Sequence, residues 1–367
     1  MSHRDLLDTK PQRGSAPALS LVNTALLLRK SCCFRPRSLA PTATQWYAKG
    51  PVVAQSLSPA ASLTTPSMFF RLRYSPFLAQ IVVIRRCNLS CGYCSEYDKV
   101  SEPVPVEILE ERLRKLKALG TFGISLTGGE PTMHPDLPRI IRTCRELRFY
   151  RTSMISNGFF LQPELIQTLN KAGLQRMQLS IDGVKANETT QKVLNNLKKR
   201  LQWLRDHARF EVVISAVIGA CPPEEADEVV SFVRQLGFGA RVLLVHDSQG
   251  QLKLSSEDLK AFEKIVDKLP RRWPEFSGYR RELVRGRPAP FKCRSGSRYL
   301  YVDEYGNVNW CSQTRNVWSK PLLDYTLNDL REQFYNYKTC NATCTLNCSR
   351  SASLFDNWRR QPAVTAS

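Results

Sequence analysis

Three cysteines, Cys87, Cys91 and Cys94, lie within eight residues of one another in the pattern C-x3-C-x2-C. Thiolates this close in sequence can face one metal cluster, and iron–sulfur cubanes are usually held by four cysteines. A triplet would therefore leave one iron open to a ligand from outside the chain. A structural zinc site is the alternative, but it requires four ligands, and the nearest histidine downstream is His134.

Polar residues that could bind a ligand follow three further apolar stretches. In Thr127-Gly128-Gly129-Glu130-Pro131, the glycines let backbone approach a ligand closely, and the carboxylate suits an ammonium group. The other two groups end in Asn-Gly and Asp-Gly, which are also favoured turn pairs, so a turn is the alternative interpretation there. The candidate ligand-binding residues are Gly128, Gly129, Glu130, Asn157, Ser180 and Asp182. No catalytic residue stands out beyond them.

Five more cysteines lie near the C-terminus: Cys293, Cys311, Cys340, Cys344 and Cys348. Between the first two, the apolar stretches Tyr299–Val302 and Val308–Trp310 flank a turn that contains Gly306, which predicts a β-hairpin. This hairpin would bring the first two thiolates together.

The elements that position these residues can be inferred from periodicity. From residue 77 to about 268, short apolar runs alternate with amphipathic stretches, which predicts an α/β fold with a parallel sheet wrapped by helices. Every polar group named above follows the carboxyl end of a predicted strand, where barrels place their active sites. Six strand–helix units favour a partial (β/α)6 barrel, with a doubly wound sheet as the alternative. The predicted strands, taken to be buried on both faces, are Ile81–Ile84, Gly123–Leu126, Ser153–Ile155, Met177–Ile181, Val212–Ile218 and Val242–Val245.

The cysteine triplet resembles the signature of the radical S-adenosylmethionine (SAM) superfamily, in which the open iron binds the amino and carboxylate groups of SAM. The residue before the third cysteine is usually aromatic in that family and lies near the adenine, and here it is Tyr93. The Gly-Gly-Glu group resembles the segment that contacts the SAM amino group, and the groups after the third and fourth strands match positions that line the ribose and carboxylate. The resemblance implies a [4Fe-4S] cluster with SAM, an electron donor such as flavodoxin or ferredoxin, and a 5′-deoxyadenosyl radical that takes hydrogen from a peptide, cofactor precursor or small metabolite.

The spacing of Cys293, Gly306 and Cys311 resembles the opening of the SPASM and Twitch modules appended to radical SAM maturases. The chain departs from the full SPASM pattern, because C-x3-C-x3-C is the last cysteine group and five thiolates cannot ligate two cubanes. We therefore expect one auxiliary [4Fe-4S] cluster held by Cys293, Cys311 and two of the last three cysteines, with Cys348 favoured and Cys340 next. A zinc site on the same residues is the alternative.

Charge and composition bear on location and partners. The formal net charge is +20, with surpluses of six in residues 1–67 and eight in residues 268–298. The second stretch interleaves arginines with aromatic residues and motivates the alternative of a nucleic-acid-binding or RNA-modifying iron–sulfur protein, although no recognisable nucleic-acid motif accompanies it. No apolar run of eighteen residues occurs, so we expect no membrane span and a cytoplasmic location. The arginines are Arg271, Arg272, Arg280, Arg281, Arg285 and Arg287, with Trp273, Phe276 and Tyr279 between them.

The predicted organisation has five parts. Residues 1–67 are an extension that is disordered, carries a targeting signal or precedes a true start at Met68. The barrel spans 75–268, a basic linker 269–290, the iron–sulfur module 291–350 and a tail 351–367. Four other cysteines have no predicted chemical role: Cys32, Cys33, Cys144 and Cys221.

Overall fold

The computed structural model describes residues 73–246, 252, 254–269, 278–315 and 317–354. These residues all lie within one compact unit. The predictions for residues 1–67, including Cys32 and Cys33, lie outside the described residues, as does the tail from residue 355 onward.

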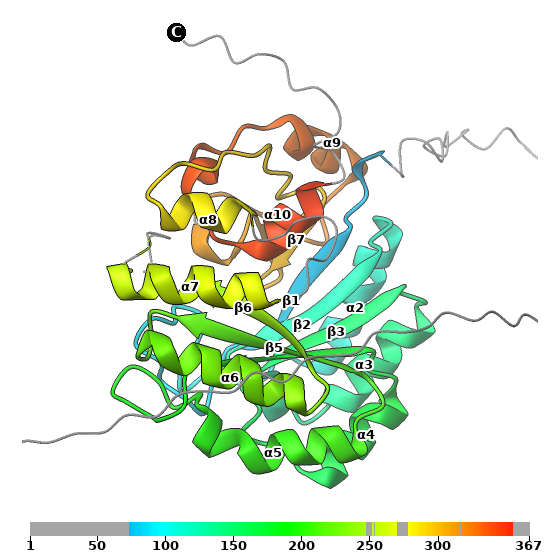
Figure 1. Cartoon of the computed structure of the whole chain (residues 1–367). Coiled ribbons are helices and arrows are strands. Elements are labelled where there is room, and N and C mark those ends of the chain that lie inside the picture. Colours follow the sequence, from blue (N-terminus) through cyan, green and yellow to red (C-terminus); the bar gives the residue numbers. More distant parts are fainter. Residues whose placement is uncertain (1–72, 247–251, 253, 270–277, 316, 355–367) are drawn as a thin grey trace, which may run out of the picture. The chain divides into compact units, whose positions relative to one another are not determined.

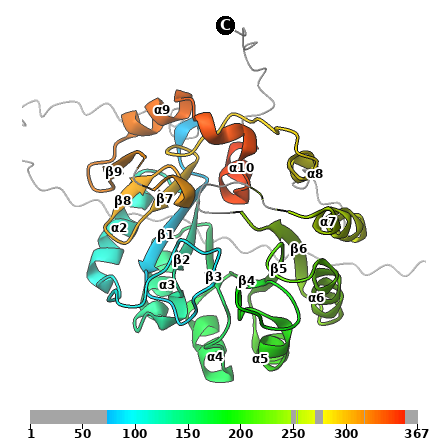
Figure 2. The ribbon, with the colours of Figure 1, turned by 90° about the vertical axis from the view of Figure 1, so that its left-hand side faces the viewer.

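Six parallel strands form the sheet of the predicted barrel (Figures 1 and 2). Each strand hydrogen-bonds in parallel to the next along the chain, so their order in the sheet follows the sequence. The sheet does not close on itself, which confirms the α/β fold with a partial barrel. The strands are β1 (Leu78–Ile84), β2 (Gly123–Gly128), β3 (Arg151–Ser156), β4 (Arg176–Ile181), β5 (Glu211–Ile218) and β6 (Gly239–Leu244).

Helices alternate with these strands and cover their outer face. In α3, Leu137, Ile140, Ile141 and Cys144 are at most 1% exposed, because they recur at helical spacing on the side that packs against the sheet. The C-terminus of α4 is capped by Gly173, whose φ of 94° is available to glycine at little cost. The helices are α2 (Val106–Ala118), α3 (Leu137–Glu146), α4 (Pro163–Ala172), α5 (Leu194–His207), α6 (Pro223–Gln235) and α7 (Ser256–Lys268), with the short η1 (Pro131–Met133) after β2.

Burial differs between the strands. β5 is buried at nearly every residue, as predicted. In β3, β4 and the second half of β6, buried residues alternate with half-buried ones, so the prediction of strands buried on both faces is wrong for these three. In β4, Met177 and Leu179 join the apolar core, whereas Gln178 and Ser180 lie on the opposite face. The inner face of the partial barrel is therefore partly polar, which suits a ligand-binding site better than a second hydrophobic core.

The C-terminal hairpin extends the same sheet. β7 (Tyr299–Val302) pairs in parallel with β1, and β8 (Asn307–Asn309) and β9 (Ser319–Pro321) follow in antiparallel order, which makes a nine-stranded sheet. The hairpin matches the predicted one to within a residue, but its union with β1 was not predicted. Tyr299 and Tyr301 are each 1% exposed, because they pack with Val82 of β1 against this part of the sheet.

Three short helices complete the described C-terminal part: α8 (Gly278–Val284), α9 (Leu327–Tyr335) and α10 (Asn347–Ser353), along with the turns η2 (Ser312–Thr314) and η3 (Thr339–Thr343). α8 lies inside the predicted basic linker. Among the described residues, no helix is both long and apolar enough to span a membrane.

Candidate SAM and iron–sulfur site

The cysteine triplet lies in the loop that follows β1. The loop is pinned to the end of the strand by two backbone hydrogen bonds, from the Cys87 amide to the Asp98 carbonyl at 3.0 Å and from the Asp98 amide to the Arg85 carbonyl at 3.1 Å. Cys87 and Cys91 are buried and Cys94 is exposed. Although the Cys94 residue as a whole is exposed, surrounding protein atoms desolvate its thiol and raise the pKa, and the Glu96 backbone opposes this effect.

The two glycines after β2 bring its end against the beginning of this loop. A Cβ on Gly129 would lie 2.2 Å from the Arg85 carbonyl oxygen and 2.5 Å from that of Arg86. Gly128 has a φ of 153°, and a Cβ there would lie 1.9 Å from the Ile84 carbonyl oxygen. Close approach of two backbones is thus the reason that glycine is required at both positions.

Glu130 is fully buried and ties the end of β2 to the end of β3. Its carboxylate accepts hydrogen bonds from the Asn157 amide at 2.7 Å, the Ser156 hydroxyl at 2.8 Å and the Thr132 amide at 3.1 Å. Burial raises its pKa and these donors oppose the increase. Protein donors thus contact the carboxylate, and the backbone at Gly128 and Gly129 is half-buried rather than buried. The assignment of Glu130, Gly128 and Gly129 to SAM stays a prediction.

Asn157 connects β3 to the triplet. Its side-chain amide donates to Oδ1 of Asn88 at 2.8 Å and lies 3.7 Å from the Cys87 sulfur. Its own Oδ1 accepts from the Phe159 amide at 3.0 Å, which is the turn predicted for Asn-Gly. Asn157 therefore serves the turn and the cysteine site together.

Asp182, which directly follows β4, contacts four polar side chains. It accepts hydrogen bonds from the Tyr93 phenol at 2.6 Å, from the Thr190 hydroxyl at 2.6 Å and from the Ser180 hydroxyl at 3.2 Å, and it forms an ion pair with Lys192 at 3.7 Å. Burial would lower the pKa of Lys192, but Asp182 and Tyr93 outweigh this effect and raise the pKa above its usual value. Sequence reasoning missed Thr190 and Lys192, because they belong to a loop with no recognisable spacing.

Polar side chains lie against the sulfurs of two of the three predicted cubane ligands. Asn157 lies beside the Cys87 sulfur, and the Thr190 hydroxyl lies 3.8 Å from the Cys91 sulfur, so two of the three thiolates have a polar side chain against them. Within the described residues, no three cysteine, histidine or acidic side chains are placed to hold a single ion. A cubane differs in that each thiolate binds its own iron.

The C-terminal cysteines lie in two electrostatic surroundings. Burial raises the pKa of Cys311 to about 11 and of Cys344 to about 12, and the nearby Cys293 thiol adds to both shifts. Burial also raises the pKa of Cys348, but its largest charged neighbours are Arg241, Arg280 and Arg176. The Cys340 residue is exposed as a whole. Desolvation of its thiol is the largest cause of its raised pKa, and the nearby Cys293 raises the pKa further. The preference for Cys348 and then Cys340 as ligands stays a prediction.

Other candidates from the sequence have structural explanations. His134 is 3% exposed, and its ring nitrogens face the Val104 carbonyl at 2.8 Å and the Asp136 amide at 3.1 Å, so it is satisfied within the core. Cys144 is fully buried in the core, and Cys221 is half-buried at the loop after β5.

Of the four arginines of the basic stretch that the structure describes, three are locally paired. Arg281 binds Asp267 at 2.6 Å, Arg285 binds Glu263 at 2.8 Å and Arg287 binds Glu282 at 2.6 Å. These carboxylates offset the charge that motivated the nucleic-acid alternative. Arg271, Arg272, Trp273 and Phe276 lie outside the described residues.

Curated relatives share part of the chain. A probable GTP 3′,8-cyclase of Archaeoglobus fulgidus is 30% identical over 170 residues, which are 44% of this chain and 55% of the relative. A GTP 3′,8-cyclase of Marinobacter nauticus is 30% identical over 165 residues, which are 42% of this chain and 50% of the relative. The chain thus spans about half the length of these relatives.

Solved structures and a family model agree on the barrel. Streptococcus suis SuiB bound to its precursor peptide SuiA has a TM-score of 0.56 at 19% identity, covering 71% of this chain and 65% of SuiB. The protein anSMEcpe with bound AdoMet and a peptide has a TM-score of 0.52 at 16% identity, covering 75% of this chain and 88% of the other. At these identities the likeness concerns the fold. The family model of the radical SAM superfamily matches residues 81–236, which include the cysteine loop and the ends of β1 to β4, and this part of the chain is a radical SAM domain.

Proposed function

We propose that this radical SAM enzyme cleaves SAM reductively and uses the product radical to remove a hydrogen atom from an organic substrate. A [4Fe-4S] cluster on Cys87, Cys91 and Cys94 would supply one electron, received from a donor such as reduced flavodoxin or ferredoxin, to split SAM into methionine and a 5′-deoxyadenosyl radical. The observation that carries the proposal is the convergence of four strand ends on the triplet through Gly129, Asn157 and Asp182.

The residues of the chain orient the reactants and do not themselves react. The glycine backbone after β2 offers carbonyl and amide groups to the SAM amino acid moiety, and Tyr93 beside the third cysteine offers its ring to the adenine. Asp182 and Lys192 hold the Tyr93 side chain, because Lys192 also lies 4.9 Å from the centre of the phenol ring. This preorganisation is the contribution expected of a protein whose cofactor carries the chemistry.

The experiment that tests the proposal is anaerobic reconstitution with iron and sulfide, reduction with dithionite in the presence of SAM, and chromatography for 5′-deoxyadenosine. We expect 5′-deoxyadenosine from the wild-type chain and none from Cys91→Ala. A well-loaded wild-type protein that forms none would overturn the proposal.

We infer further that the substrate carries an anionic group. Arg241 of β6 donates to the Ser215 hydroxyl of β5 at 2.8 Å, and burial lowers its pKa to about 10, with Arg176 and Arg280 adding repulsion. Arg280 is 5% exposed, and its Nη2 has no hydrogen-bond partner in the described part of the chain. A buried positive field of this kind favours phosphate or carboxylate.

A nucleoside triphosphate and a carboxylate-bearing peptide both carry such an anionic group. GTP is the first to test, because the curated relatives named above are GTP 3′,8-cyclases. We expect GTP to increase 5′-deoxyadenosine formation, and Arg241→Gln to raise the KM for GTP about tenfold. The matched control is Arg285→Gln, which removes an exposed ion pair with Glu263. An unchanged KM in Arg241→Gln, or stimulation by neutral substrates alone, would contradict the inference.

We also propose that Cys293, Cys311 and two of the last three cysteines hold an auxiliary [4Fe-4S] cluster. The support is that Cys293 and Cys311 are both 8% exposed and lie near each other, with Cys344 close to both. Its test is the iron count given in the Discussion.

A further inference from the structure

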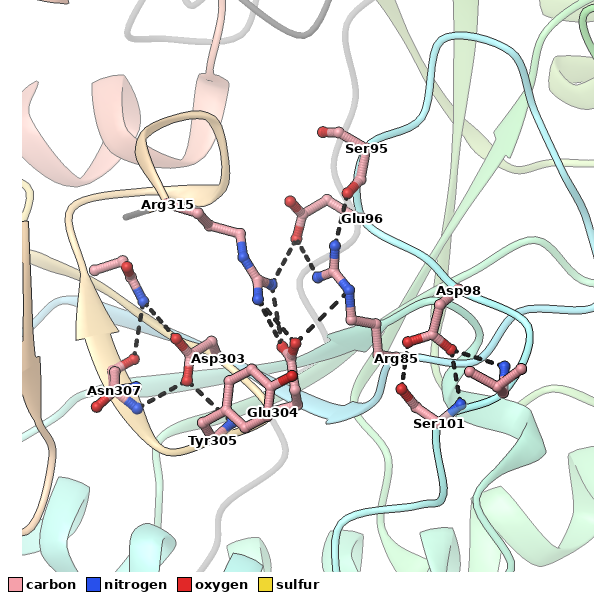
Figure 3. A network of polar contacts seen from close by, with 12 residues as sticks. Arg85, Ser95, Glu96, Asp98, Ser101, Asp303, Glu304, Tyr305, Asn307 and Arg315 are labelled. Carbon is pink, nitrogen blue, oxygen red and sulfur yellow. Dashed lines mark hydrogen bonds and ion pairs between the residues drawn. The ribbon is translucent and has the colours of Figure 1, made fainter. Parts of the chain in front are cut away.

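A network of charged side chains joins the cysteine loop to the C-terminal hairpin (Figure 3). We call it the latch, and it consists of Arg85, Glu96, Tyr301, Glu304 and Arg315. Two of these residues flank the triplet: Arg85 directly follows β1, and Glu96 lies two positions after Cys94. The other three belong to β7, the β7–β8 turn and the segment after Cys311.

The centre of the latch is Glu304. Its carboxylate accepts hydrogen bonds from Arg315 at 2.8, 3.0 and 3.1 Å and forms an ion pair with Arg85 Nε at 3.6 Å. Arg315 also lies 3.8 Å from Glu96, and Arg85 lies 4.0 Å from Glu96. The four side chains thus form a ring in which arginines and glutamates alternate, as Figure 3 shows.

The latch contacts the cysteine loop at Ser95 and Glu96, just after Cys94. Arg85 Nη2 donates to the Ser95 carbonyl at 2.8 Å, and the Tyr301 phenol donates to the Glu96 carboxylate. Ser95 and Glu96 directly follow Cys94, so contacts that fix these two residues also fix the backbone that carries the third thiolate. Groups that orient a ligand in this way affect how well a metal centre is retained.

Burial makes the latch sensitive to the loss of one partner. The side chains of Glu304 and Arg315 are 10% and 16% exposed, and those of Arg85 and Glu96 are 17% and 24% exposed. Removing one charge from a desolvated network leaves the others uncompensated, whereas an exposed pair costs little to break.

We propose that Glu304 and Arg315 are positioning residues for the cysteine triplet: through Arg85 and Glu96, the C-terminal hairpin seats the loop that carries Cys94. Neither residue contacts the reacting atoms. The hairpin that carries Cys311 is therefore energetically coupled to the triplet site, and loosening the hairpin loosens the loop.

The test is hydrogen–deuterium exchange of the full chain, followed by mass spectrometry of peptides that cover residues 87–98. We expect Glu304→Gln to increase exchange in this loop about tenfold, with peptides of β3 to β5 unchanged. The matched control is Glu102→Gln, because Glu102 is 82% exposed and forms a surface ion pair at 3.6 Å with Arg86 beside the same loop. Loop exchange in Glu304→Gln equal to that in the control would overturn the proposal.

A second variant covers the case in which Glu304→Gln unfolds more of the sheet. Tyr301→Phe removes only the hydroxyl that donates to Glu96 and keeps the buried ring. It should increase exchange in the same loop, and unchanged exchange in this variant would also overturn the proposal. In reconstituted protein, both variants should lose triplet-bound iron to a chelator faster than the control. The exchange readout requires neither SAM nor radical chemistry, so its failure would leave the proposed function standing.

Discussion

The phenol of Tyr93 donates a hydrogen bond to Oδ2 of Asp182 across 2.6 Å, and this contact joins the cysteine loop after β1 to the end of β4. Residues eighty-nine positions apart thus share one buried network with Lys192 and Thr190. The orientation of Tyr93 therefore depends on Asp182 at the end of β4, and we expect substitutions there to affect the cysteine loop.

The first prediction concerns the charge balance of this network. Asp182→Asn leaves the Lys192 cation buried without its partner, and we expect a loss of about 3–5 kcal/mol in the free energy of unfolding. Urea denaturation of the apo chain measures it. Asp206→Asn, which breaks an exposed pair with Arg205, should change the free energy of unfolding far less. Lys192→Met added to Asp182→Asn should recover much of the loss, and a double variant no more stable than the single one would contradict this account.

The second prediction concerns the glycine after β2. Gly129→Ala places a Cβ against the carbonyl oxygens of Arg85 and Arg86, so the loop must shift at a cost of about 1–3 kcal/mol. We expect less iron bound after reconstitution and less 5′-deoxyadenosine. Gly92→Ala is the control within the cysteine loop, because its nearest atoms would be at 3.9 Å, an ordinary contact. Equal iron content in the two variants would count against the close approach.

The third prediction concerns pH. Burial lowers the pKa of His134 below its usual 6.5, so the unfolded chain takes up this proton more readily than the folded one. The contribution of His134 to stability is therefore fully present above about pH 6.5 and decreases as the pH falls toward 5, by at most about 1.4 kcal/mol per pH unit. Denaturation at pH 7.5 and 5.5 measures it. His134→Gln should reduce the difference, and a difference unchanged in this variant would contradict the assignment to His134.

The fourth prediction is an iron count. Two cubanes imply about eight irons per chain, and one implies about four. We expect about four after Cys91→Ala and about four after Cys293→Ala, because each substitution disables a different cluster. Zinc in place of the second set of irons would favour a zinc site on the C-terminal cysteines.

The same count identifies the spare cysteine. Single alanine variants of Cys340, Cys344 and Cys348 should include one that retains about eight irons. Loss of the auxiliary irons in all three, or in none, would contradict a site built from two of them.

Much of the barrel could be predicted because it depends on local pattern. Apolar runs such as Val212–Ile218 form strands, and helices such as α3 bury residues at helical spacing. The candidate residues Glu130, Asn157 and Asp182 could be placed together in advance, since parallel strands end at one edge of the sheet. What Glu130 does there could not be foreseen: it binds Ser156, Thr132 and the Asn157 backbone, and their meeting depends on how β2 and β3 align.

The sequence by itself determined the cysteine triplet, the order of the barrel strands and the residues at their ends, because each is set by neighbours a few positions away in the chain. The tertiary structure alone decided that β7 pairs with β1, that Lys192 forms an ion pair with Asp182, and that Glu304 and Arg315 reach the loop of Cys94. These contacts join residues from 10 to more than 200 positions apart, where burial and charge pairing in the folded chain determine the partners and no local spacing encodes them.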